Sequence, residues 1–121
     1  MRTQLPYTLI AQSLFKRGWR HDKGEAPLRE NLASGLLALA DWDPNAPLID
    51  PFCGSGTILI EAAWIALGAP PGLWRPFHFE RLRHHDMGTW QDLKAEARAN
   101  MATTIEVRLI GSDLNPAAIE A

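Results

Sequence analysis

Residues 47–65 read PLIDPFCGSGTILIEAAWI, and this stretch is the most informative part of the 121-residue chain. A short apolar run ends in the carboxylate of Asp50, passes through a glycine-rich turn and continues directly as an apolar helix. That order is typical of a parallel α/β sheet that binds a small molecule at the carboxyl end of a strand. Gly54 and Gly56 let the backbone turn tightly and leave room for a ligand to approach. The free N–H groups at the start of the helix then face an anionic group of that ligand.

Three kinds of glycine-rich site compete for this turn, and residue spacing separates them. A phosphate-binding P-loop needs a lysine and a longer loop than residues 54–57 provide. A dinucleotide fingerprint needs a third glycine where Leu59 stands, and an acidic strand end about 20 residues further on. Both are disfavoured, as is a tight turn that binds nothing. The third kind is a site for S-adenosylmethionine, whose amino and carboxylate groups suit a strand-end carboxylate beside a helix N-terminus.

Residues 50–57, DPFCGSGT, closely resemble motif I of the class I methyltransferases, in the form used by amino-group methyltransferases. This resemblance implies that the motif binds S-adenosylmethionine, with Thr57 or Ser55 donating to the methionine carboxylate. Cys53 is better interpreted as a small residue that fills space under the loop than as a nucleophile, because no basic partner is near it in sequence. The cofactor-binding residues predicted in the motif are Asp50, Pro51, Phe52, Cys53, Gly54, Ser55, Gly56 and Thr57.

A second strand end supports this interpretation. Residues 105–110, IEVRLI, alternate between apolar and polar before the chain reaches a glycine, a serine and Asp113. Asn115 then suits a helix N-cap, and Pro116 suits the first helical position. By resemblance to the class I methyltransferases, Asp113 accepts hydrogen bonds from the cofactor's ribose hydroxyls and Leu114 packs against the adenine. A solvated turn residue is the alternative interpretation of Asp113.

Composition places the chain among ordinary soluble globular proteins, with 46% hydrophobic and 21% charged residues. The apolar stretch 58–67 is interrupted by Glu61 and is too short to cross a membrane. The single cysteine excludes a disulfide framework. Together with an N-terminus that lacks a leader-like apolar segment, it predicts a cytoplasmic protein.

A net charge of −2 is not typical of a nucleic-acid-binding protein, which usually carries a basic surplus. Residues 16–23, KRGWRHDK, are a local exception with four basic side chains and a tryptophan. Lys16, Arg17 and Arg20 could contact phosphates while Trp19 stacks on a base. An exposed turn with a solvated basic face is the alternative, and the charge pattern alone favours it.

Periodicity and turn signals predict the elements before the motif. Residues 7–20 are expected to form one or two short strands with a turn at Gly18. Pro27 is expected to begin a helix whose apolar stripe is Leu28, Leu32, Leu36 and Leu39. Residues 58–67, after the glycine-rich turn, are apolar on nearly all sides, which predicts a helix sandwiched between other elements.

Residues 68–87 show no clear period and are rich in proline and histidine, so we expect an irregular excursion there. Thr89 is expected to cap the next helix, whose apolar stripe is Trp90, Leu93, Ala97 and Met101. The adjacent histidines at 84 and 85 lack the spacing that places two metal ligands on one helix face, so no metal site is predicted.

Together these elements predict an α/β protein with a Rossmann-like class I methyltransferase fold, of which only the first part of the parallel sheet is present. Its segments are leading strands and a turn (1–25), a helix with the motif I strand and helix (26–67), an irregular insertion (68–88), and a helix, second strand and helix start (89–121). A parallel sheet of two strands leaves apolar edges and faces uncovered. We therefore expect the amino-terminal part of a larger domain rather than a free-standing enzyme.

Four segments, LFKRGWR (14–20), GEAPLRENLA (24–33), LIDPFCGSGTILIEA (48–62) and GSD (111–113), together resemble one family. They are similar to the bacterial 23S rRNA guanine-N2 methyltransferases of the RlmL type, a group once labelled N6-adenine-specific DNA methylases. The resemblance implies methyl transfer from S-adenosylmethionine to a guanine exocyclic amine of 23S rRNA. It also implies rRNA as a partner, contacted mostly outside this chain, with Lys16, Arg17, Trp19 and Arg20 as candidate contacts within it.

Members of that family carry an RNA-binding THUMP domain and an Asn-Pro-Pro-Tyr motif that accepts the protons of the target amine. No segment of these 121 residues corresponds to either of them. Asn115-Pro116 is not the Asn-Pro-Pro-Tyr motif, because alanines follow it and it is typical of a helix start. The chain is therefore expected to supply the methyl-donor half of the site, to contain no catalytic residue and to be inactive alone. The resemblance also places Pro27 and Glu30 beside the cofactor pocket, with ordinary helix-start chemistry as an equal alternative. Glu61 either reaches the pocket or points to the surface.

Two other functions stay open on the sequence. A DNA adenine or tRNA guanine methyltransferase would use a very similar motif I, and the acceptor motif and flanking domains would separate them from an rRNA enzyme. A non-catalytic adaptor would bind no cofactor and would act by packing on a partner. Titration with S-adenosylhomocysteine separates the adaptor from the enzymes.

Overall fold

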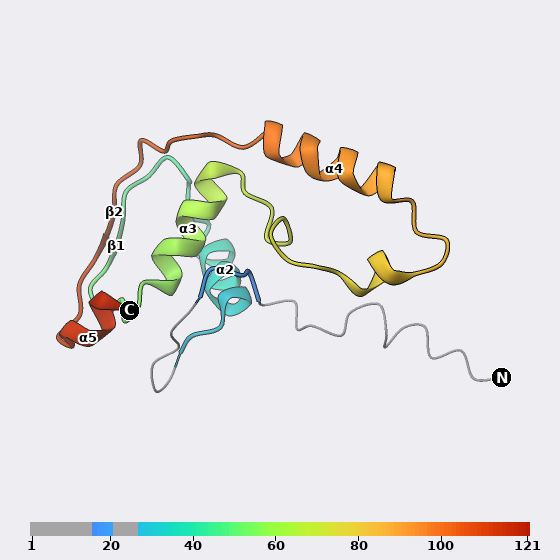
Figure 1. The fold of residues 1–121 in the computed structure, drawn as a ribbon. Coiled ribbons are helices and arrows are strands. Elements are labelled where there is room, and N and C mark those ends of the chain that lie inside the picture. The colour runs from blue at the N-terminus through green and yellow to red at the C-terminus, as the bar shows by residue number, and fades with distance from the viewer. Residues whose placement is uncertain (1–15, 21–26) are drawn as a thin grey trace.

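The computed structural model describes residues 16–20 and 27–121. Helices and strands alternate along the chain, and the two strands are parallel neighbours, so the predicted α/β class is confirmed. The elements are helix α2 (Glu30–Leu39), strand β1 (Leu48–Asp50), helix α3 (Thr57–Leu67), a 3-10 helix (His78–Arg81), helix α4 (Met87–Ala99), strand β2 (Leu109–Gly111) and helix α5 (Pro116–Glu120) (Figure 1).

The sheet is formed by β1 and β2, with Leu48 opposite Leu109 and Asp50 opposite Gly111. The predicted second strand, residues 105–110, is therefore shorter at its start and ends one residue later. The N–H of Leu48 donates to the carbonyl of Arg108 at 2.9 Å, and this is the first bond between the two segments.

Helix α3 lies between the sheet and α2, as its apolar surface predicted (Figure 1). It begins directly after the glycine-rich turn, at Thr57, and ends at Gly68, whose φ of 67° is the left-handed conformation typical of a helix C-terminus. Ala62 is completely buried, as is Ala33 on the facing side of α2. Small residues at this contact let the two helices approach closely.

Helix α2 starts at Glu30, three positions after the predicted start, because Arg29 is still extended with ψ 143°. Its predicted leucine stripe is wrong. Leu32, Leu36 and Leu39 are exposed, the last at 87%, whereas Glu30, Ala33 and Leu37 face the interior. The helix is rotated so that small and medium side chains meet α3 and the carboxylate of Glu30 meets a buried arginine. Periodicity could not choose between these two faces.

Residues 16–20 form a bend rather than a strand. Gly18 lies at a φ of 92°, in the left-handed region, and it reverses the chain so that the side chains on either side turn inward. The turn predicted at Gly18 is thus confirmed, and the strand prediction is wrong for the other described positions, 16–17 and 19–20. Its remaining part, residues 7–15, lies outside the described residues.

Residues 68–86 contain only the short 3-10 helix, in agreement with the predicted excursion. The segment nevertheless packs its aromatic rings. The ring centroids of Phe77 and Phe79 lie 5.4 Å apart, and Trp90 of α4 meets Phe79 edge-on at 4.9 Å. These contacts connect the excursion to α4 and were not anticipated from the sequence.

Helix α4 begins at Met87 and is capped by Asp86, not by Thr89 as predicted. One oxygen of Asp86 accepts the backbone N–H of Thr89 at 3.1 Å, and the other accepts the threonine hydroxyl at 2.9 Å. These hydrogen bonds stabilise the charged carboxylate and lower the pKa of Asp86 below its ordinary value. Thr89 is therefore the partner of the cap rather than the cap itself.

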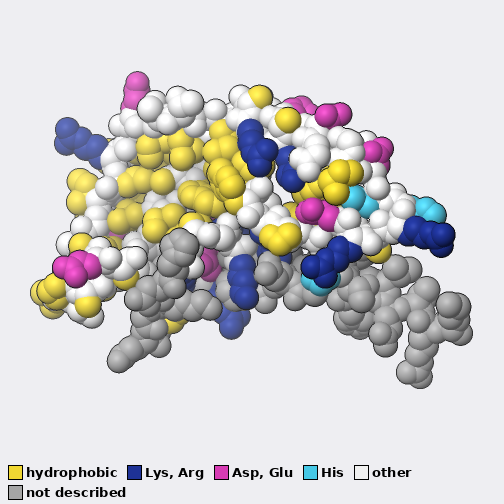
Figure 2. Space-filling view, viewed as in Figure 1, with side chains coloured by type: hydrophobic (Ala, Val, Ile, Leu, Met, Phe, Trp, Pro, Cys, Tyr) yellow, Lys and Arg dark blue, Asp and Glu magenta, His cyan; other side chains and the backbone are white. Residues whose placement is uncertain are grey.

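Hydrophobic side chains gather on the face of the molecule over β1, β2 and α3 (Figure 2). Ile49 in β1 and Ile110 in β2 are 66% and 48% exposed. The two-stranded sheet thus leaves an apolar face uncovered, as predicted. Among the described residues, no helix has the length and apolar character needed to cross a bilayer.

Candidate cofactor-binding site

The two strand ends lie side by side at one edge of the sheet. Beyond the last strand pair, the N–H of Ser112 donates to the carbonyl of Asp50 at 3.0 Å, and the N–H of Cys53 donates to the carbonyl of Ser112 at 2.9 Å. The two loops that follow the strands are therefore joined by backbone hydrogen bonds. This brings the predicted residues Asp50 and Asp113 to the same edge.

The carboxylate of Asp113 connects the second strand end to the glycine-rich turn. One oxygen accepts the N–H of Gly54 at 3.0 Å, and the other accepts the N–H of Asn115 at 2.8 Å. Asp50 is held in a similar way, since its side chain accepts the N–H of Phe52 at 3.1 Å. Each carboxylate oxygen has two lone pairs, so both groups keep acceptor capacity toward a ligand.

The glycine-rich turn depends on backbone conformation at two positions. Gly54 and Gly56 have φ values of 56° and 85°, in the left-handed region that disfavours other residues. A Cβ built on Gly54 would meet no atom within 4 Å. The glycine is therefore required by the path of the chain rather than by crowding, and the space in front of the turn is open to a ligand.

Helix α3 presents its N-terminus to this turn. Gly56 is the N-cap residue, no side chain of the described part of the chain caps the helix, and no acidic residue lies in its first turn. The first intrahelical bond runs from the N–H of Ile60 to the carbonyl of Gly56 at 2.8 Å. The preceding helical N–H groups lack intrahelical acceptors and, with the helix dipole, favour an anionic group.

The two hydroxyls predicted to donate at this N-terminus lie in different places. Ser55 is half-buried in the turn. Thr57 is buried at 5% exposure, and its Oγ1 accepts a hydrogen bond from the guanidinium of Arg20. Ser55 is therefore the better candidate for a direct contact, and Thr57 faces the interior. Phe52 and Leu114 present largely exposed apolar side chains beside the strand ends.

Cys53 lies beneath the loop. A Cβ built on Gly111 would come within 2.8 Å of its Sγ and 2.5 Å of Leu59 Cδ1, so the thiol fills space against the end of β2. Burial raises the pKa of the Cys53 thiol, and the nearby carboxylates of Asp50 and Asp113 raise it further. A thiol of this kind is a weak nucleophile, in agreement with its interpretation as a packing residue.

The basic segment at residues 16–20 is directed inward. Arg17 Nε lies 3.3 Å from Glu61 Oε1, and the side chains are only 9% and 4% exposed. Arg20 Nε lies 3.3 Å from Glu30 Oε1, with side chains 8% and 5% exposed. The prediction that Arg17 and Arg20 contact phosphates is therefore wrong, and so is its alternative of a solvated turn. Both charges are used within the protein.

The remaining members of that segment differ. Lys16 is exposed, and Trp19 is half-buried with the guanidinium of Arg20 5.1 Å from its ring centroid. Glu61 is 3% exposed, so the interpretation that it points to the surface is wrong, while its reach to the cofactor pocket stays a prediction. Burial raises the pKa of Glu61 above its ordinary value of 4.5, although the Arg17 guanidinium opposes this shift.

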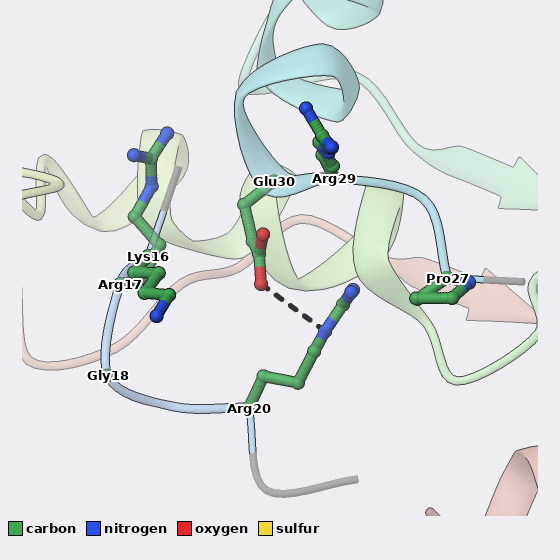
Figure 3. Close-up of a pocket in the computed structure, with 7 residues that line it drawn as sticks. All are labelled: Lys16, Arg17, Gly18, Arg20, Pro27, Arg29 and Glu30. Atoms are coloured by element: carbon green, nitrogen blue, oxygen red, sulfur yellow. Dashed lines mark ion pairs between the residues drawn. The ribbon is translucent and has the colours of Figure 1, made fainter. Parts of the chain in front are cut away.

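A pocket of about 530 Å³ lies beside this buried cluster (Figure 3). Both Glu30 and Pro27 are in its wall, the two residues that resemblance placed beside a cofactor pocket. Because Arg20 both lines the pocket and contacts Thr57, the pocket adjoins the first turn of α3. The lining residues are Lys16, Arg17, Gly18, Arg20, Pro27, Arg29 and Glu30.

No group of three potential metal ligands comes together in residues 16–20 and 27–121. His85, in the histidine pair, packs its ring against Phe79 with centroids 5.5 Å apart. The sequence reasoning missed the two arginine–carboxylate pairs. One signal was available, because Glu61 is the only charge in an otherwise apolar helix and a buried charge requires a partner.

Comparisons with known proteins agree with the fold described above. The family described as RMKL-like, methyltransferase domain, matches residues 17–121. A relative from Shewanella sp. (strain W3-18-1), named ribosomal RNA large subunit methyltransferase K/L, is 50% identical over 85% of this chain. The chain spans only 15% of that relative's length.

Two solved structures share the fold. SMU.472, described as a methyltransferase complexed with SAH, superposes with a TM-score of 0.80 and 37% identity over 88% of this chain and 28% of its own. A protein from Listeria monocytogenes str. 4b F2365, described as a predicted N6-adenine-specific DNA methylase, gives a TM-score of 0.81 at 39% identity over the same shares. At these identities, the likeness extends beyond the general fold.

Proposed function

Because the chain belongs to the RMKL-like methyltransferase domain family, we propose that it supplies the S-adenosylmethionine-binding part of an enzyme that methylates a guanine exocyclic N2 amine in 23S rRNA. The observation that carries this proposal is the pair of adjacent strand ends. Asp50 and Asp113 lie at one edge of the sheet, and Asp113 is joined to the glycine-rich turn through Gly54. Two carboxylates and a helix N-terminus at one edge match the polar groups of this cofactor.

Each part of the edge has a distinct role in the proposal. The N–H groups at the start of α3 and the Ser55 hydroxyl bind the methionine carboxylate, and Asp50 accepts from the methionine amino group. Asp113 accepts from the ribose hydroxyls, while Leu114 and Phe52 cover the adenine. When bound, the cofactor supplies a methyl group already activated by its sulfonium. The protein's contribution is orientation of the donor toward the acceptor.

The acceptor half of the reaction is assigned to residues outside these 121. Asn115 accepts the N–H of Ala117 at 3.1 Å and serves as the N-cap of α5, so Asn115-Pro116 is not the amine-binding motif. We assign no catalytic residue to this chain and expect it to be inactive alone. We place the enzyme in the cytoplasm with its rRNA, and of the predicted rRNA contacts only Lys16 and Trp19 stay in the proposal.

Titration with S-adenosylhomocysteine tests cofactor binding directly. The unmodified chain is expected to bind, and Gly56→Val is expected to abolish binding because a β-branched residue is strained at a φ of 85°. Gly35→Ala is the matched control, since Gly35 lies within α2 and an added Cβ there meets nothing within 4 Å. Equal heat signals from the unmodified chain and Gly56→Val, or none from either, would favour the adaptor instead.

The full product of the open reading frame that contains this chain tests the substrate. It is supplied with S-adenosylmethionine that carries a labelled methyl group, and transfer is measured into 23S rRNA, tRNA and adenine-containing DNA. Transfer to a guanine of 23S rRNA is expected. The description of the Listeria structure makes DNA adenine methylation the second candidate, and labelling of DNA alone would establish it in place of the first.

A further inference from the structure

Arg20 lies where three parts of the molecule meet. Its guanidinium donates to the carbonyl of Leu28 at 2.9 Å, in the segment that leads into α2. The same group pairs with the carboxylate of Glu30 at 3.3 Å and donates to Thr57 Oγ1. One side chain thus connects the bend at residues 16–20 to the starts of both α2 and α3.

The contact with Thr57 is the one that concerns the cofactor site. Thr57 is the first residue of α3 and follows Gly56, whose N–H donates to the carbonyl of Cys53 at 2.9 Å. Among the described residues, no side chain caps the N-terminus of this helix. The hydrogen bond from Arg20 to Thr57 therefore acts directly on the orientation of the N–H groups that face the turn.

The ion pair between Arg20 and Glu30 that holds this guanidinium is buried. The side chains of Arg20 and Glu30 are 8% and 5% exposed, so water does not compete freely for either charge. In Figure 3, Glu30 reaches from α2 toward Arg20 across the wall of the pocket, while Arg29 points away from this pair. The charge of Arg20 is thus held in place from α2, and its hydrogen bond to α3 couples the two helices.

We propose that Arg20 is a positioning residue for the methionine end of the cofactor site. It acts through Thr57 to hold the first turn of α3, and it does not contact the cofactor itself. This inference rests on the function proposed above. The planar guanidinium has five N–H donors in a fixed geometry and can serve three acceptors at once, which a lysine ammonium at the same position cannot do in the same arrangement.

Two ligands separate positioning from general stability. S-adenosylhomocysteine contains the amino-acid part, whereas 5′-methylthioadenosine keeps the adenosine and lacks that part. Arg20→Met and the milder Arg20→Lys are expected to weaken S-adenosylhomocysteine binding about tenfold and about threefold, because a charge-assisted hydrogen bond at the helix start is lost. Binding of 5′-methylthioadenosine is expected to stay within about twofold of the unmodified chain.

Arg17→Met is the matched control. It breaks the buried pair with Glu61, which lies further along α3 than Thr57. This variant is expected to lose stability without any preference between the two ligands. An equal loss for both ligands in Arg20→Met and Arg17→Met would overturn the positioning role.

Hydrogen exchange measures the effect of the Arg20–Thr57 hydrogen bond without any ligand. In Arg20→Lys the amides of Gly56 and Ile60, which close the turn and the first helical bond, are expected to exchange several-fold faster than in the unmodified chain. Amides in the second half of α3 serve as the internal reference for folding. Unchanged exchange at Gly56 and Ile60 would overturn the role of Arg20 alone. A chain that binds neither ligand would instead overturn the proposed function, and this role with it.

Discussion

At the scale of single residues, the charges near the motif have two destinations. Asp50 and Asp113 lie at the strand ends and are held by backbone N–H groups, which leaves them able to accept from a ligand. Glu30 and Glu61 instead pair with arginines in the interior. Breaking a buried pair is costly because it leaves one charge desolvated without a partner. Acidic residues therefore serve recognition at the strand ends and stabilise the packing of the interior.

Glu61 predicts a pH dependence of stability. Its folded pKa is raised above 4.5, so the folded chain holds this proton more tightly than the unfolded chain. The stabilising contribution is fully present below the unfolded pKa and is lost as pH rises through the folded pKa. The free energy of unfolding of the unmodified chain should therefore fall relative to that of Glu61→Gln as the pH rises from about 4 through the folded pKa of Glu61.

Urea unfolding followed by circular dichroism over that pH range measures the difference. Glu96→Gln, on the exposed side of α4, controls for the general effect of removing one negative charge. Two curves that stay parallel for the unmodified chain and Glu61→Gln would show that Glu61 titrates alike in both states.

At the scale of elements, α3 carries both the packing and the recognition of this region. Its sides are covered by the sheet and by α2, and its N-terminus faces the glycine-rich turn. Recognition therefore depends on how closely α3 sits on the strands. One tight point is Gly111 at the end of β2, where an added Cβ would lie too close to Leu59 and Cys53.

Gly111→Ala tests this contact. The new methyl group would meet Leu59 Cδ1 at 2.5 Å and Cys53 Sγ at 2.8 Å. Both atoms end side chains that can rotate, so we expect a loss of about 1 kcal/mol in unfolding free energy, at the lower end for overpacking. The cofactor affinity should fall as well, because Cys53 belongs to the turn.

A double-mutant cycle with Leu59→Ala checks the cause. If the helix–strand contact is responsible, Leu59→Ala relieves part of the cost of Gly111→Ala, and the two effects are not additive. Strictly additive losses in chemical unfolding would place the cost elsewhere.

At the scale of the whole molecule, the sheet is covered on one side only. Helix α3 packs against one face, while Ile49 and Ile110 lie exposed on the strands. Three leucines of α2 are exposed further away, namely Leu32, Leu36 and Leu39. Strands of a parallel sheet are normally buried on both faces. The chain also spans 28% of the solved structures that share its fold, so those proteins have a large share of structure that these residues do not represent.

The uncovered face predicts self-association. Ile49→Thr keeps a β-branched residue in the strand and removes apolar surface, so it should reduce concentration-dependent association and the binding of a hydrophobic dye. Its unfolding free energy should change by no more than about 0.5 kcal/mol, as expected for a surface position. Sedimentation velocity at several concentrations measures the association.

Leu37→Thr provides the comparison from the buried side of α2. Leu37 is 5% exposed, so Leu37→Thr should lower the free energy of unfolding and should not reduce self-association. Equal association of Ile49→Thr and the unmodified chain would show that this face does not drive contacts between molecules.

The sequence alone determined the features that depend on neighbouring residues. The path from Asp50 through Gly54 and Gly56 into α3 follows from local turn chemistry, and Asn115 and Pro116 start α5 for equally local reasons. The cap of α4 is equally local, since Asp86 precedes Thr89 by three positions and accepts its N–H. Short-range hydrogen bonds and φ values are properties of a few consecutive residues.

The tertiary structure alone decided which face of α2 is buried and where the arginines go. An apolar stripe on α2 predicted Leu32 and Leu36 inside, yet the contact with α3 selected Ala33 and Leu37. Likewise, residues 16–20 read as a solvated basic turn until Glu30 and Glu61 supplied buried partners. Both outcomes depend on residues distant in sequence, because burial and charge pairing are settled by which surfaces meet in the folded chain.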